Sequence, residues 1–456
     1  MSSLPGPFLA GLGSLFPPAR CHTDIADCYA YSYDNSRKIF PPGAVVFPVD
    51  AEEVRSLILL CNEFEVPVTP RGRGTGTAGG SIPERGGVAL SLERMRRILE
   101  VDAKNRVIVA EPGVLNQEIQ DAARPHGFFW PPDPSSSAFC SIGGNLATCA
   151  GGPHAVKYGT TREHVLGLKA VTGKGEAIKA GCYTTKGVVG YDLTRLIIGS
   201  EGTLAVITEA TLKLTPLPDA TGGIAAHYRD AQSAALAIIA IMGQSVVPSA
   251  LEFLDGGSLD LIRSRHPGMI PESSRAMLMI EVDGADIAQD CGAILASCGN
   301  EGLIDAGQVT DPGDLWAARR ALSPLLRDIA PKKINEDIVV PVSRLPELLG
   351  GLDRLSSQYD LANVNFGHAG NGNIHVNLLV DPENSQEMGR AEICLGMIFD
   401  LVLALNGTLS GEHGVGREKR SYVSREIDPA TLGLMKGIKS VFDPKGILNP
   451  GKLFPQ

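Results

Sequence analysis

The sequence predicts an α+β protein with two domains, and three observations support this prediction. The chain has 456 residues, of which 43% are hydrophobic and 20% charged, so it can form two packed cores and has a globular composition. The first 216 residues contain short apolar runs of strand length between loops rich in glycine, serine and proline. After Pro216 and Pro218, strand-like and helix-like segments alternate, which indicates an α/β layer.

The expected domain boundaries follow these changes in pattern. Residues 1–40 are rich in proline, tyrosine and aspartate and should form an N-terminal arm. The first domain would then cover residues 41–218 and the second domain residues 219–440. The C-terminal segment 441–456 is rich in turn-forming residues and is expected to return to the first domain.

The first domain should open with a strand at 44–49 and a helix after Asp50. Glu53 stands three residues beyond Asp50, as in a capping box, and the helix should run to about Phe64. Residues 131–163 should be mostly loop because they are dense in proline, serine and glycine. Further runs of strand length lie at 66–70, 88–92, 107–111, 165–171 and 204–214.

The second domain should alternate strands with helices and contain one long helix. The long helix is expected at about 387–405, and Gly407 follows it as a typical helix terminator. The alternating segments that precede it lie at 224–228, 231–242, 250–254, 276–282 and 287–297. These segments predict a sheet covered by helices.

Composition excludes several classes of function. The net charge is −10 and no block of lysine or arginine occurs, which argues against nucleic acids and anionic membranes as main partners. The nine cysteines have no CxxC spacing, which indicates reduced cytoplasmic thiols and no iron–sulfur ligand run. No apolar run reaches the roughly 20 residues of a membrane span, and residues 8–16 lack the flanks of a signal peptide. A cytoplasmic protein is therefore expected.

A glycine-rich loop at residues 70–81 is the strongest candidate for a phosphate site. Its five glycines let backbone N–H groups converge on an anion, and Arg71 and Arg73 add positive charge. The glycine spacing matches a dinucleotide motif, but Pro83 and further glycines follow, so no helix can start and a Rossmann fold is excluded. The alternative is a mobile surface loop.

Other small-residue segments resemble this loop in composition. They lie at 131–136, 141–145, 150–153 and 199–203, and the last is followed by Ile207. Several such loops in one domain fit a long ligand that is bound along its length.

Histidines and a glutamate form a second group. His368 and His375 are seven residues apart across a glycine-rich turn, and Glu412 and His413 follow the long helix. Two imidazoles and one carboxylate are a common ligand set for a divalent metal. The alternative is that the histidines only stabilise turns.

A tryptophan and two arginines form the third group. Trp316 precedes Arg319 and Arg320, in a helix whose expected N-cap is Asp311. An arginine can bind a carboxylate through two parallel hydrogen bonds. Paired arginines also commonly lie on a solvated helix face, so that alternative stays open.

The motifs RGxGT, PPDP, SIGGN and GSEGT, in this order, closely resemble those of FAD-linked oxidases of the vanillyl-alcohol oxidase/p-cresol methylhydroxylase type. Within that family, the chain is similar to the D-lactate dehydrogenases, glycolate oxidase FAD subunits and D-2-hydroxyglutarate dehydrogenases over about residues 20–456. The resemblance implies a two-part FAD-binding domain and an α/β substrate (cap) domain with a metal site. The glycine loop lacks the histidine usual for covalent flavin, so non-covalent FAD is expected.

The resemblance also implies roles for individual residues. His368, His375 and Glu412 match ligands of a divalent metal, often zinc, and His413 matches the general base. Arg319 matches the arginine that binds the substrate carboxylate, with Ser323, Asn377 and Lys333 as further substrate contacts and Lys332 as the alternative lysine. Residues 443–452 resemble the family's terminal segment, which folds back onto the flavin domain, and this implies that Asn449 and Lys452 contact FAD. The implied FAD contacts are Arg71, Gly72, Arg73, Gly74, Thr75, Gly76, Thr77, Gly80, Ser81, Pro132, Asp133, Ser135, Ser141, Gly143, Gly144, Asn145, Ala150, Gly151, Gly152, Glu201, Gly202, Ile207 and Asn449.

The expected reaction is the metal-assisted oxidation of a small D-2-hydroxy acid to the 2-oxo acid. D-lactate or glycolate is favoured because residues 332–342 look closest to those members, and D-2-hydroxyglutarate is the alternative. Electrons would pass to a separate iron–sulfur subunit or electron-transfer flavoprotein. The protein itself would associate with a membrane at most peripherally, and a homodimer is compatible with this interpretation. Two rival interpretations are a metal-dependent hydrolase without flavin and a flavin-binding subunit without turnover of its own.

Overall fold

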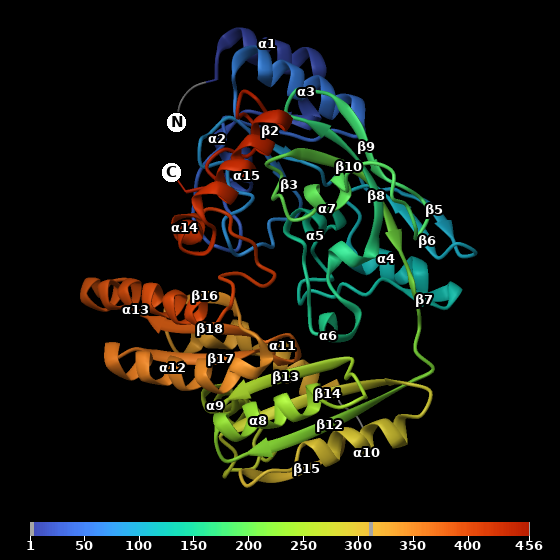
Figure 1. Ribbon diagram of the computed structural model, residues 1–456. Helices are drawn as coiled ribbons and strands as arrows, with labels where there is room; N and C mark the ends of the chain where they lie inside the picture. The colour runs from blue at the N-terminus through green and yellow to red at the C-terminus, as the bar shows by residue number, and fades with distance from the viewer. Residues whose placement is uncertain (1–3, 310–312, 456) are drawn as a thin grey trace. The chain divides into compact units, whose positions relative to one another are not determined.

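The computed structural model describes residues 4–309 and 313–455, and the chain divides into two compact units (Figure 1). The first unit consists of Met1–Gly151, Gly159–Leu217 and Glu412–Gln456, and the second of Gly152–Tyr158 and Pro218–Gly411. The chain thus rejoins the first unit at Glu412, whereas the sequence suggested a return at about residue 441. The reason is that residues 415 and 416 are hydrogen bonded to Glu201 of the first unit. The expected N-cap Asp311 lies outside the described residues.

The N-terminal part of the first unit is a small sheet with three α-helices. The strand order is β1-β2-β4-β3, and β4 is parallel to both β2 and β3. Helix α3 begins after Asp50, whose carboxylate accepts a hydrogen bond from the Glu53 N–H, so the predicted cap is confirmed. The bounds are α1 (Gly6–Leu15), β1 (Cys21–His22), α2 (Ile25–Tyr29), β2 (Ala44–Val46), α3 (Ala51–Phe64), β3 (Val68–Arg71) and β4 (Val88–Ser91).

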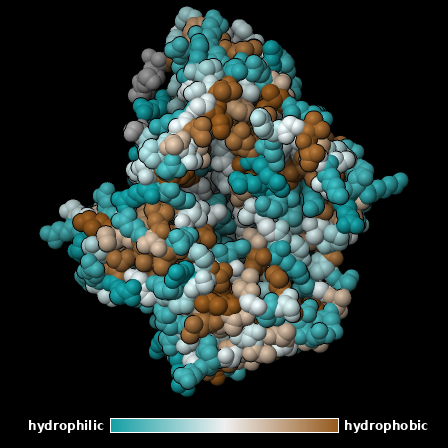
Figure 2. Space-filling view, viewed as in Figure 1, coloured by the Kyte–Doolittle hydropathy of each residue, from teal (hydrophilic) through white to brown (hydrophobic). Residues whose placement is uncertain are grey.

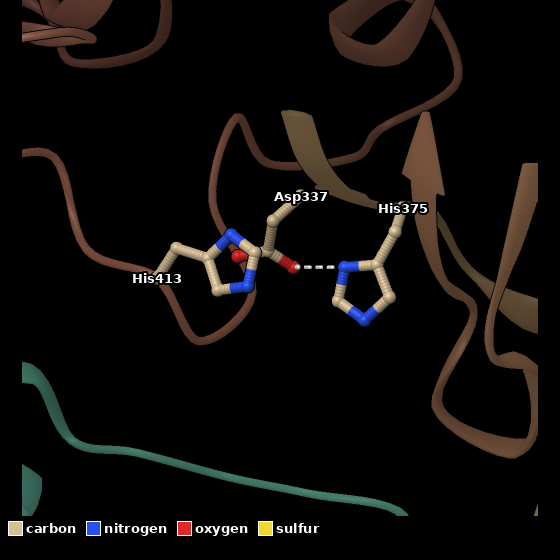
Figure 3. Close-up of side chains that lie close together, drawn as sticks. All are labelled: Asp337, His375 and His413. Carbon is tan, nitrogen blue, oxygen red and sulfur yellow. Dashed lines mark ion pairs between the residues drawn. The ribbon is translucent and has the colours of Figure 1, made fainter. Parts of the chain in front are cut away.

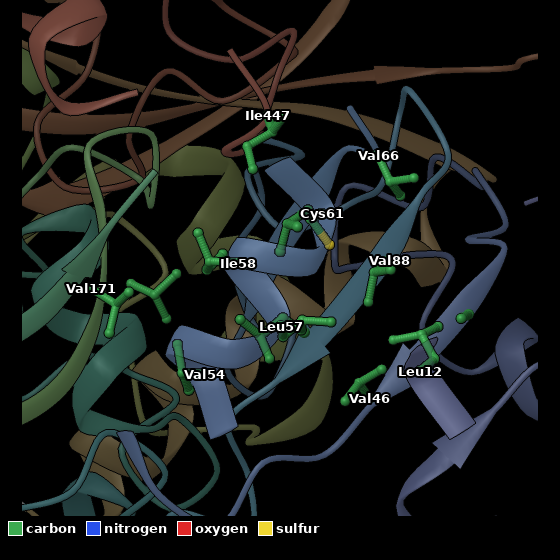
Figure 4. Close-up of a cluster of buried hydrophobic side chains, with 14 of the residues drawn as sticks. Leu12, Val46, Val54, Leu57, Ile58, Cys61, Val66, Val88, Val171 and Ile447 are labelled. Atoms are coloured by element: carbon green, nitrogen blue, oxygen red, sulfur yellow. The ribbon is translucent and has the colours of Figure 1, made fainter. Parts of the chain in front are cut away.

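The core of this part lies between α3 and the sheet. Val54, Leu57, Ile58 and Cys61 recur at helical spacing and are fully buried (Figure 4). They pack in one cluster with the strands and with Ile447 and Leu448 from the end of the chain. The C-terminal segment is therefore part of the core of the first unit.

The rest of the first unit is an antiparallel sheet of order β5-β6-β10-β8-β9. Residues 131–163 were expected to be mostly loop but also contain short helices. Helix α5 forms despite its two glycines because Ser141 caps it and its apolar residues are buried. The bounds are β5 (Ile98–Asp102), β6 (Val107–Ala110), α4 (Asn116–Ala123), β7 (Phe128–Phe129), α5 (Ile142–Thr148), β8 (Val165–Thr172), β9 (Ala177–Gly181), α7 (Leu193–Ile197), β10 (Ala205–Lys213), β11 (Thr215–Pro216), α14 (Val423–Glu426) and α15 (Pro429–Phe442).

The second unit is a seven-stranded antiparallel sheet with helices, as the alternating pattern predicted. Its strand order is β15-β12-β14-β13-β17-β18-β16. The short helix α6 (Ala155–Tyr158) also belongs to this unit. The bounds of the strands are β12 (Ala220–Tyr228), β13 (Ala250–Asp255), β14 (Ala276–Gly284), β15 (Leu303–Val309), β16 (Lys332–Val339), β17 (Ala362–His368) and β18 (Asn373–Val380). The helices are α8 (Ala231–Met242), α9 (Gly256–Arg265), α10 (Ile287–Ser297), α11 (Gly313–Leu325), α12 (Leu345–Tyr359) and α13 (Ser385–Ala404).

Strand register places several polar residues on one face of this sheet. Residues directly opposite each other on paired strands have side chains on the same face. Glu252 on β13 is opposite His368 on β17, and His375 on β18 is opposite both Phe366 and Asp337. Helices α9 and α11 contribute apolar side chains to a core cluster with Phe366. The polar residues therefore share a face with a packed core.

Hydrophilic and hydrophobic residues are interspersed on the face of the molecule drawn in Figure 2. Among the helices of residues 4–309 and 313–455, none is both long enough and apolar enough to cross a bilayer.

Candidate active site

A tight turn between two central strands brings His368 and His375 together. His368 is the last residue of β17, and a 3-10 turn, Ala369–Asn371, leads into β18. Gly372 closes this turn with φ +72°, and a Cβ there would lie 1.9 Å from the Val340 carbonyl oxygen, so the position requires glycine. The two histidine Nε2 atoms lie 3.4 Å apart, and both side chains are buried.

A carboxylate lies on the far side of each imidazole. The Nδ1 atom of His368 is hydrogen bonded to Oε1 of Glu252, and Nδ1 of His375 lies 3.9 Å from Oδ1 of Asp337 (Figure 3). Both carboxylates have no exposed surface. With the Nδ1 atoms directed at carboxylates, the two Nε2 atoms point towards a common position.

The spacing of the two Nε2 atoms suits a metal ion. A tetrahedral zinc ion with nitrogen ligands at about 2.05 Å would hold them about 3.3 Å apart. The observed separation is 3.4 Å. Carboxylates behind metal-binding histidines are a common arrangement because they fix the tautomer that leaves the other nitrogen able to ligate. The residues present therefore fit a metal site.

Glu252 also binds Arg319, the predicted substrate arginine. Nε and Nη2 of Arg319 lie 2.7 and 2.6 Å from Oε2 of Glu252, and the guanidinium group lies 4.5 Å from the centre of the Phe366 ring. Burial alone would raise the pKa of the Glu252 carboxyl, but the neighbouring His368 and Arg319 lower it to about 2. Glu252 is thus ionised, and His368 donates its Nδ1–H to it.

Sequence reasoning missed Glu252 and Asp337. Glu252 stands in the apolar run 250–254, and its only signal was that it is the single carboxylate among buried apolar residues. Asp337 accepts hydrogen bonds from Nδ2 of Asn373 and from the backbone N–H of Gly411, at 2.6 and 2.9 Å. Each carboxylate therefore connects segments that are far apart in the sequence.

Of the other predicted substrate contacts, Lys333 lies on β16, Asn377 on β18 and Ser323 in helix α11. Nζ of Lys333 donates to the backbone oxygen of Ser323 at 3.1 Å and also bonds to its hydroxyl group. Lys332 faces Met388 instead, with Nζ 4.0 Å from its sulfur atom. Asn377 is fully buried and accepts a hydrogen bond from Asn335 at 2.7 Å. Strand alternation thus places Lys333, and not Lys332, on the face with Ser323.

Glu412 and His413 follow directly on the segment that Asp337 binds. Gly411 is the last residue of the second unit and Glu412 the first residue of the returning part of the first unit. Consecutive Cα atoms are about 3.8 Å apart, so Glu412 and His413 must lie within about 4 and 8 Å of the Gly411 Cα atom. The covalent chain therefore keeps the Cα atoms of both residues close to Gly411, whose N–H group Asp337 binds.

The segment after His413 is bound to predicted FAD loops of the first unit. The backbone N–H groups of Val415 and Gly416 donate to the Glu201 carboxylate at 2.7 and 2.8 Å. The N–H of Arg417 donates to the carbonyl oxygen of Ala78 at 2.9 Å. A Cβ added to Gly151 would lie 2.8 Å from the Glu412 carboxylate. The carboxylate of Glu201, which the sequence assigned to FAD, is thus occupied by the segment that carries His413.

Within the first unit, the predicted FAD loops also contact each other. A Cβ on Gly72 would lie 2.4 Å from Oγ of Ser141, and Gly74 with φ +66° lies against the Arg71 guanidinium group. Nδ2 of Asn449 donates to the backbone oxygens of Gly80 and Glu201, at 2.8 and 2.7 Å. The loops at 71–81, 141–145 and 199–203 therefore meet, together with Asn449.

The remaining predicted contacts lie around these loops. Arg73 forms an ion pair with Glu93 at 3.5 Å, Thr75, Gly76, Thr77 and Ser81 lie in the loop itself, and Pro132, Asp133 and Ser135 precede α5. Gly143, Gly144 and Asn145 lie in α5, Ala150 follows it, Gly152 opens the short segment of the second unit, Gly202 follows Glu201, and Ile207 is buried in β10.

Two buried cations lie near the loops. Burial lowers the pKa of Arg71, and it lowers the pKa of Lys452 to about 8. The nearest carboxylate oxygen to Nζ of Lys452 is that of Glu84 at 3.7 Å, and the amine makes no hydrogen bond within the described residues. Buried positive charge of this kind suits a bound anion, because an anion would replace the lost hydration.

Two family models match consecutive parts of the chain. The FAD binding domain model matches residues 42–181, and the model of the C-terminal domain of FAD linked oxidases matches residues 217–453. Fold and sequence together define an FAD-dependent oxidoreductase, as the sequence predicted. The chain belongs to the family of FAD-linked oxidases.

Relatives with named activities match over nearly the whole chain. The glycolate oxidase subunit GlcD of Bacillus subtilis is 38% identical over 430 residues, which cover 93% of this chain and 92% of that protein. A D-lactate dehydrogenase of Archaeoglobus fulgidus is 35% identical and covers 98% of each chain. A D-2-hydroxyglutarate dehydrogenase of Stutzerimonas stutzeri is 32% identical and covers 97% of this chain and 98% of that protein.

Solved structures confirm the predicted fold type. The structure of p-cresol methylhydroxylase with bound substrate matches with a TM-score of 0.80 at 17% identity, and the match covers 100% of this chain and 98% of that one. An alkyldihydroxyacetonephosphate synthase matches with a TM-score of 0.79 at 20% identity, over 99% of this chain and 86% of that one. At these identities, the matches establish the fold alone.

Proposed function

We propose that the protein oxidises a small D-2-hydroxy acid to the 2-oxo acid, with D-lactate or glycolate as the preferred substrate. One observation carries the proposal: Arg319 and His368 bind the same buried carboxylate, so a carboxylate-binding cation stands beside a candidate metal site. A 2-hydroxy acid presents a carboxylate next to a hydroxyl group and therefore needs these two groups side by side. The relatives named for glycolate, D-lactate and D-2-hydroxyglutarate support the substrate class.

FAD would be held without a covalent bond by the loops at 71–81, 141–145 and 199–203 and by Asn449. Two observations support this assignment. The loops contact one another and Asn449, and the cations Arg71 and Lys452 are buried. Zinc would be held by His368, His375 and Glu412, because two imidazoles and one carboxylate are a common ligand set for a divalent metal. When bound, FAD would accept the hydride from C2 and the metal would act as a Lewis acid on the hydroxyl group.

The residues of the chain bind the substrate and move its proton. Glu252 engages Nε and Nη2 of Arg319, so Nη1 and the second N–H of Nη2 can be offered to the substrate carboxylate. Lys333, with Ser323 beside it, would add a second donor to the substrate. His413 would take the hydroxyl proton as the general base, which is a common role for an imidazole near neutral pH. The hydrogen bonds of Glu201 to residues 415 and 416 would fix the segment that carries it.

Reduced FAD would pass its electrons to a separate protein. All nine cysteines are free thiols scattered over the chain, so the described residues offer no cysteine cluster for an iron–sulfur centre. Two relatives are named as a subunit of glycolate oxidase, which supports an acceptor on another chain, such as an iron–sulfur subunit or an electron-transfer flavoprotein.

The substrate is tested by steady-state oxidation of D-lactate, glycolate and D-2-hydroxyglutarate with an artificial electron-accepting dye. The proposal predicts that kcat/KM for D-lactate or glycolate exceeds that for D-2-hydroxyglutarate by about tenfold or more, as a difference of about 1.4 kcal/mol in transition-state binding would give. A preference for D-2-hydroxyglutarate would select the alternative substrate. Oxidation of none of the three acids would favour a flavin-binding subunit without turnover of its own.

A further inference from the structure

One carboxylate, that of Glu252, holds two groups with different proposed roles. Its Oε1 atom bonds to Nδ1 of His368, a candidate metal ligand, and its Oε2 atom accepts from Nε and Nη2 of Arg319, the candidate substrate anchor. The carboxylate has no exposed surface. Each oxygen atom therefore has its own charged or ring partner.

The sheet itself fixes this arrangement. Glu252 on β13 and His368 on β17 are directly opposite each other in an antiparallel pair, although they are 116 residues apart in the sequence. Side chains at such positions lie on the same face at close range. Phe366, two residues before His368 on the same face, lies against the Arg319 guanidinium group. Glu252 is thus held by backbone register and is not a flexible counter-ion.

Glu252 cannot itself be a ligand of a metal at the Nε2 atoms. It contacts the Nδ1 side of the His368 ring, whereas Nε2 of this ring faces Nε2 of His375 at 3.4 Å. The carboxylate instead accepts a hydrogen bond from the Nδ1–H group of His368, which leaves the lone pair of Nε2 available for a metal.

The second oxygen of Glu252 determines which edge of Arg319 remains for a substrate. The Nε–Nη2 edge of the guanidinium group is taken up by Oε2, so a substrate carboxylate can bind in a bidentate manner only at the Nη1–Nη2 edge. A single carboxylate therefore sets the tautomer of one group and the orientation of the other.

We propose that Glu252 is a positioning residue that aligns the metal site and the substrate-carboxylate site with each other. This inference rests on the proposed function. It goes beyond that function because it names the residue that fixes the distance between the metal site, which would bind the substrate hydroxyl group, and Arg319, which would bind the substrate carboxylate. Such spacing restricts the site to acids whose hydroxyl group is on the carbon next to the carboxylate.

The Glu252→Gln variant tests the tautomer directly. The glutamine oxygen can still accept from Arg319, but its NH₂ group would then face Nδ1 of His368 and require that nitrogen to accept. The proton would move to Nε2 and block metal binding. We expect the zinc affinity of the flavin-loaded protein, measured by competition with a chelator, to fall about 10- to 100-fold. Glu252→Asp keeps the charge and should recover part of this loss.

The substrate side is tested by the binding of oxalate and of 3-hydroxypropionate, which carries its hydroxyl group one carbon further from the carboxylate. Wild type should bind oxalate more tightly than 3-hydroxypropionate, and Glu252→Gln should reduce this preference for oxalate. The matched control is Glu281→Gln, which removes another carboxylate of the same sheet that binds a histidine, His154, at 2.9 Å. This control should retain wild-type zinc affinity and ligand preference.

A purely structural role of Glu252 gives a different result. It predicts a lower unfolding temperature for Glu252→Gln, with unchanged zinc affinity and ligand preference in the folded, FAD-loaded fraction, and this result would overturn the proposal. If wild type binds zinc no better than His375→Ala, the proposed metal is wrong, and the oxalate preference alone then decides the role of Glu252 towards Arg319. An unchanged preference in that case would also overturn the positioning role.

Discussion

His368 and His375 face each other through their Nε2 atoms, 3.4 Å apart, while the Nδ1 atom of each ring is directed at a buried carboxylate. A turn that only needed stabilising would not require two carboxylates to orient both rings. The pairing instead creates a position where two nitrogen lone pairs converge, which is the first requirement of a metal site.

Replacement of His375 by alanine should therefore remove the metal but not the flavin. We expect about one bound zinc ion per wild-type chain and a substoichiometric amount in His375→Ala, measured by elemental analysis of dialysed protein. The FAD content should stay at the wild-type level because the loops assigned to FAD lie in the first unit. His266→Ala removes an exposed histidine of the second unit and should retain zinc. Equal zinc in all three proteins would contradict the assignment.

His413 should control proton removal from the substrate. The variant His413→Gln is expected to reduce the rate of flavin reduction, measured by anaerobic stopped-flow absorbance, by about 10²-fold or more, which is a typical contribution of a general base. Its zinc and FAD contents should match wild type. The remaining activity should rise with pH as hydroxide replaces the missing base. A reduction rate close to that of wild type would remove His413 from this role.

Gly76 offers a test of the FAD loop that does not disturb the fold. A Cβ at this position meets no atom within 4 Å and the residue has no positive φ, so Gly76→Ala should fold as wild type does. If the loop lies against FAD, the added methyl group contacts the cofactor and should weaken FAD binding about tenfold or more, since a forced contact costs about 1–3 kcal/mol. Titration of the apoprotein with FAD measures this.

The control is Gly433→Ala in α15, another glycine with open space around its Cβ position. It should bind FAD as wild type does. Wild-type affinity in both variants would show that residue 76 does not approach the cofactor.

Glu201 should make stability depend on pH. Burial raises the pKa of Glu201 from 4.5 to about 7, despite the hydrogen bonds from Val415 and Gly416. The folded protein then binds this proton more tightly than the unfolded chain, so between about pH 4.5 and 7 this group makes the fold less stable as pH rises. A glutamine at this position does not titrate, so Glu201→Gln lacks this contribution to the pH dependence of stability.

As pH rises from 5 to 8, the unfolding temperature of wild type should therefore fall relative to that of Glu201→Gln. The corresponding free energy is up to about 3 kcal/mol, because one pKa unit is worth about 1.4 kcal/mol. Thermal unfolding of both FAD-loaded proteins at several pH values measures the difference. A difference that does not change with pH would contradict the raised pKa.

Local signals in the sequence predicted much of the fold. Asp50 and Glu53 marked the start of α3, and the long helix α13 was expected within two residues of its observed ends, because caps and periodicity act within one helix. Helix α5 was missed because its two glycines resemble a loop. The cap from Ser141 and the burial of Ile142 and Leu146 outweigh the poor helix propensity of glycine there.

The candidate site was predictable only where its residues are close in sequence or match a motif. The turn from His368 to His375 could be inferred from its glycines, whereas Glu252 could not, because its contact with His368 depends on the register between β13 and β17. The return of the chain at Glu412 likewise depends on hydrogen bonds to Glu201, more than 200 residues earlier. Such contacts come from tertiary packing and leave no local pattern.

The most direct test of the proposed function is the visible spectrum of the purified protein before and after anaerobic addition of D-lactate or glycolate. We predict a yellow protein whose flavin absorbance is bleached within the mixing time or over seconds, with one 2-oxo acid formed per flavin reduced. D-2-hydroxyglutarate should bleach it more slowly. A yellow protein that none of these acids bleaches would contradict the proposed oxidation of 2-hydroxy acids.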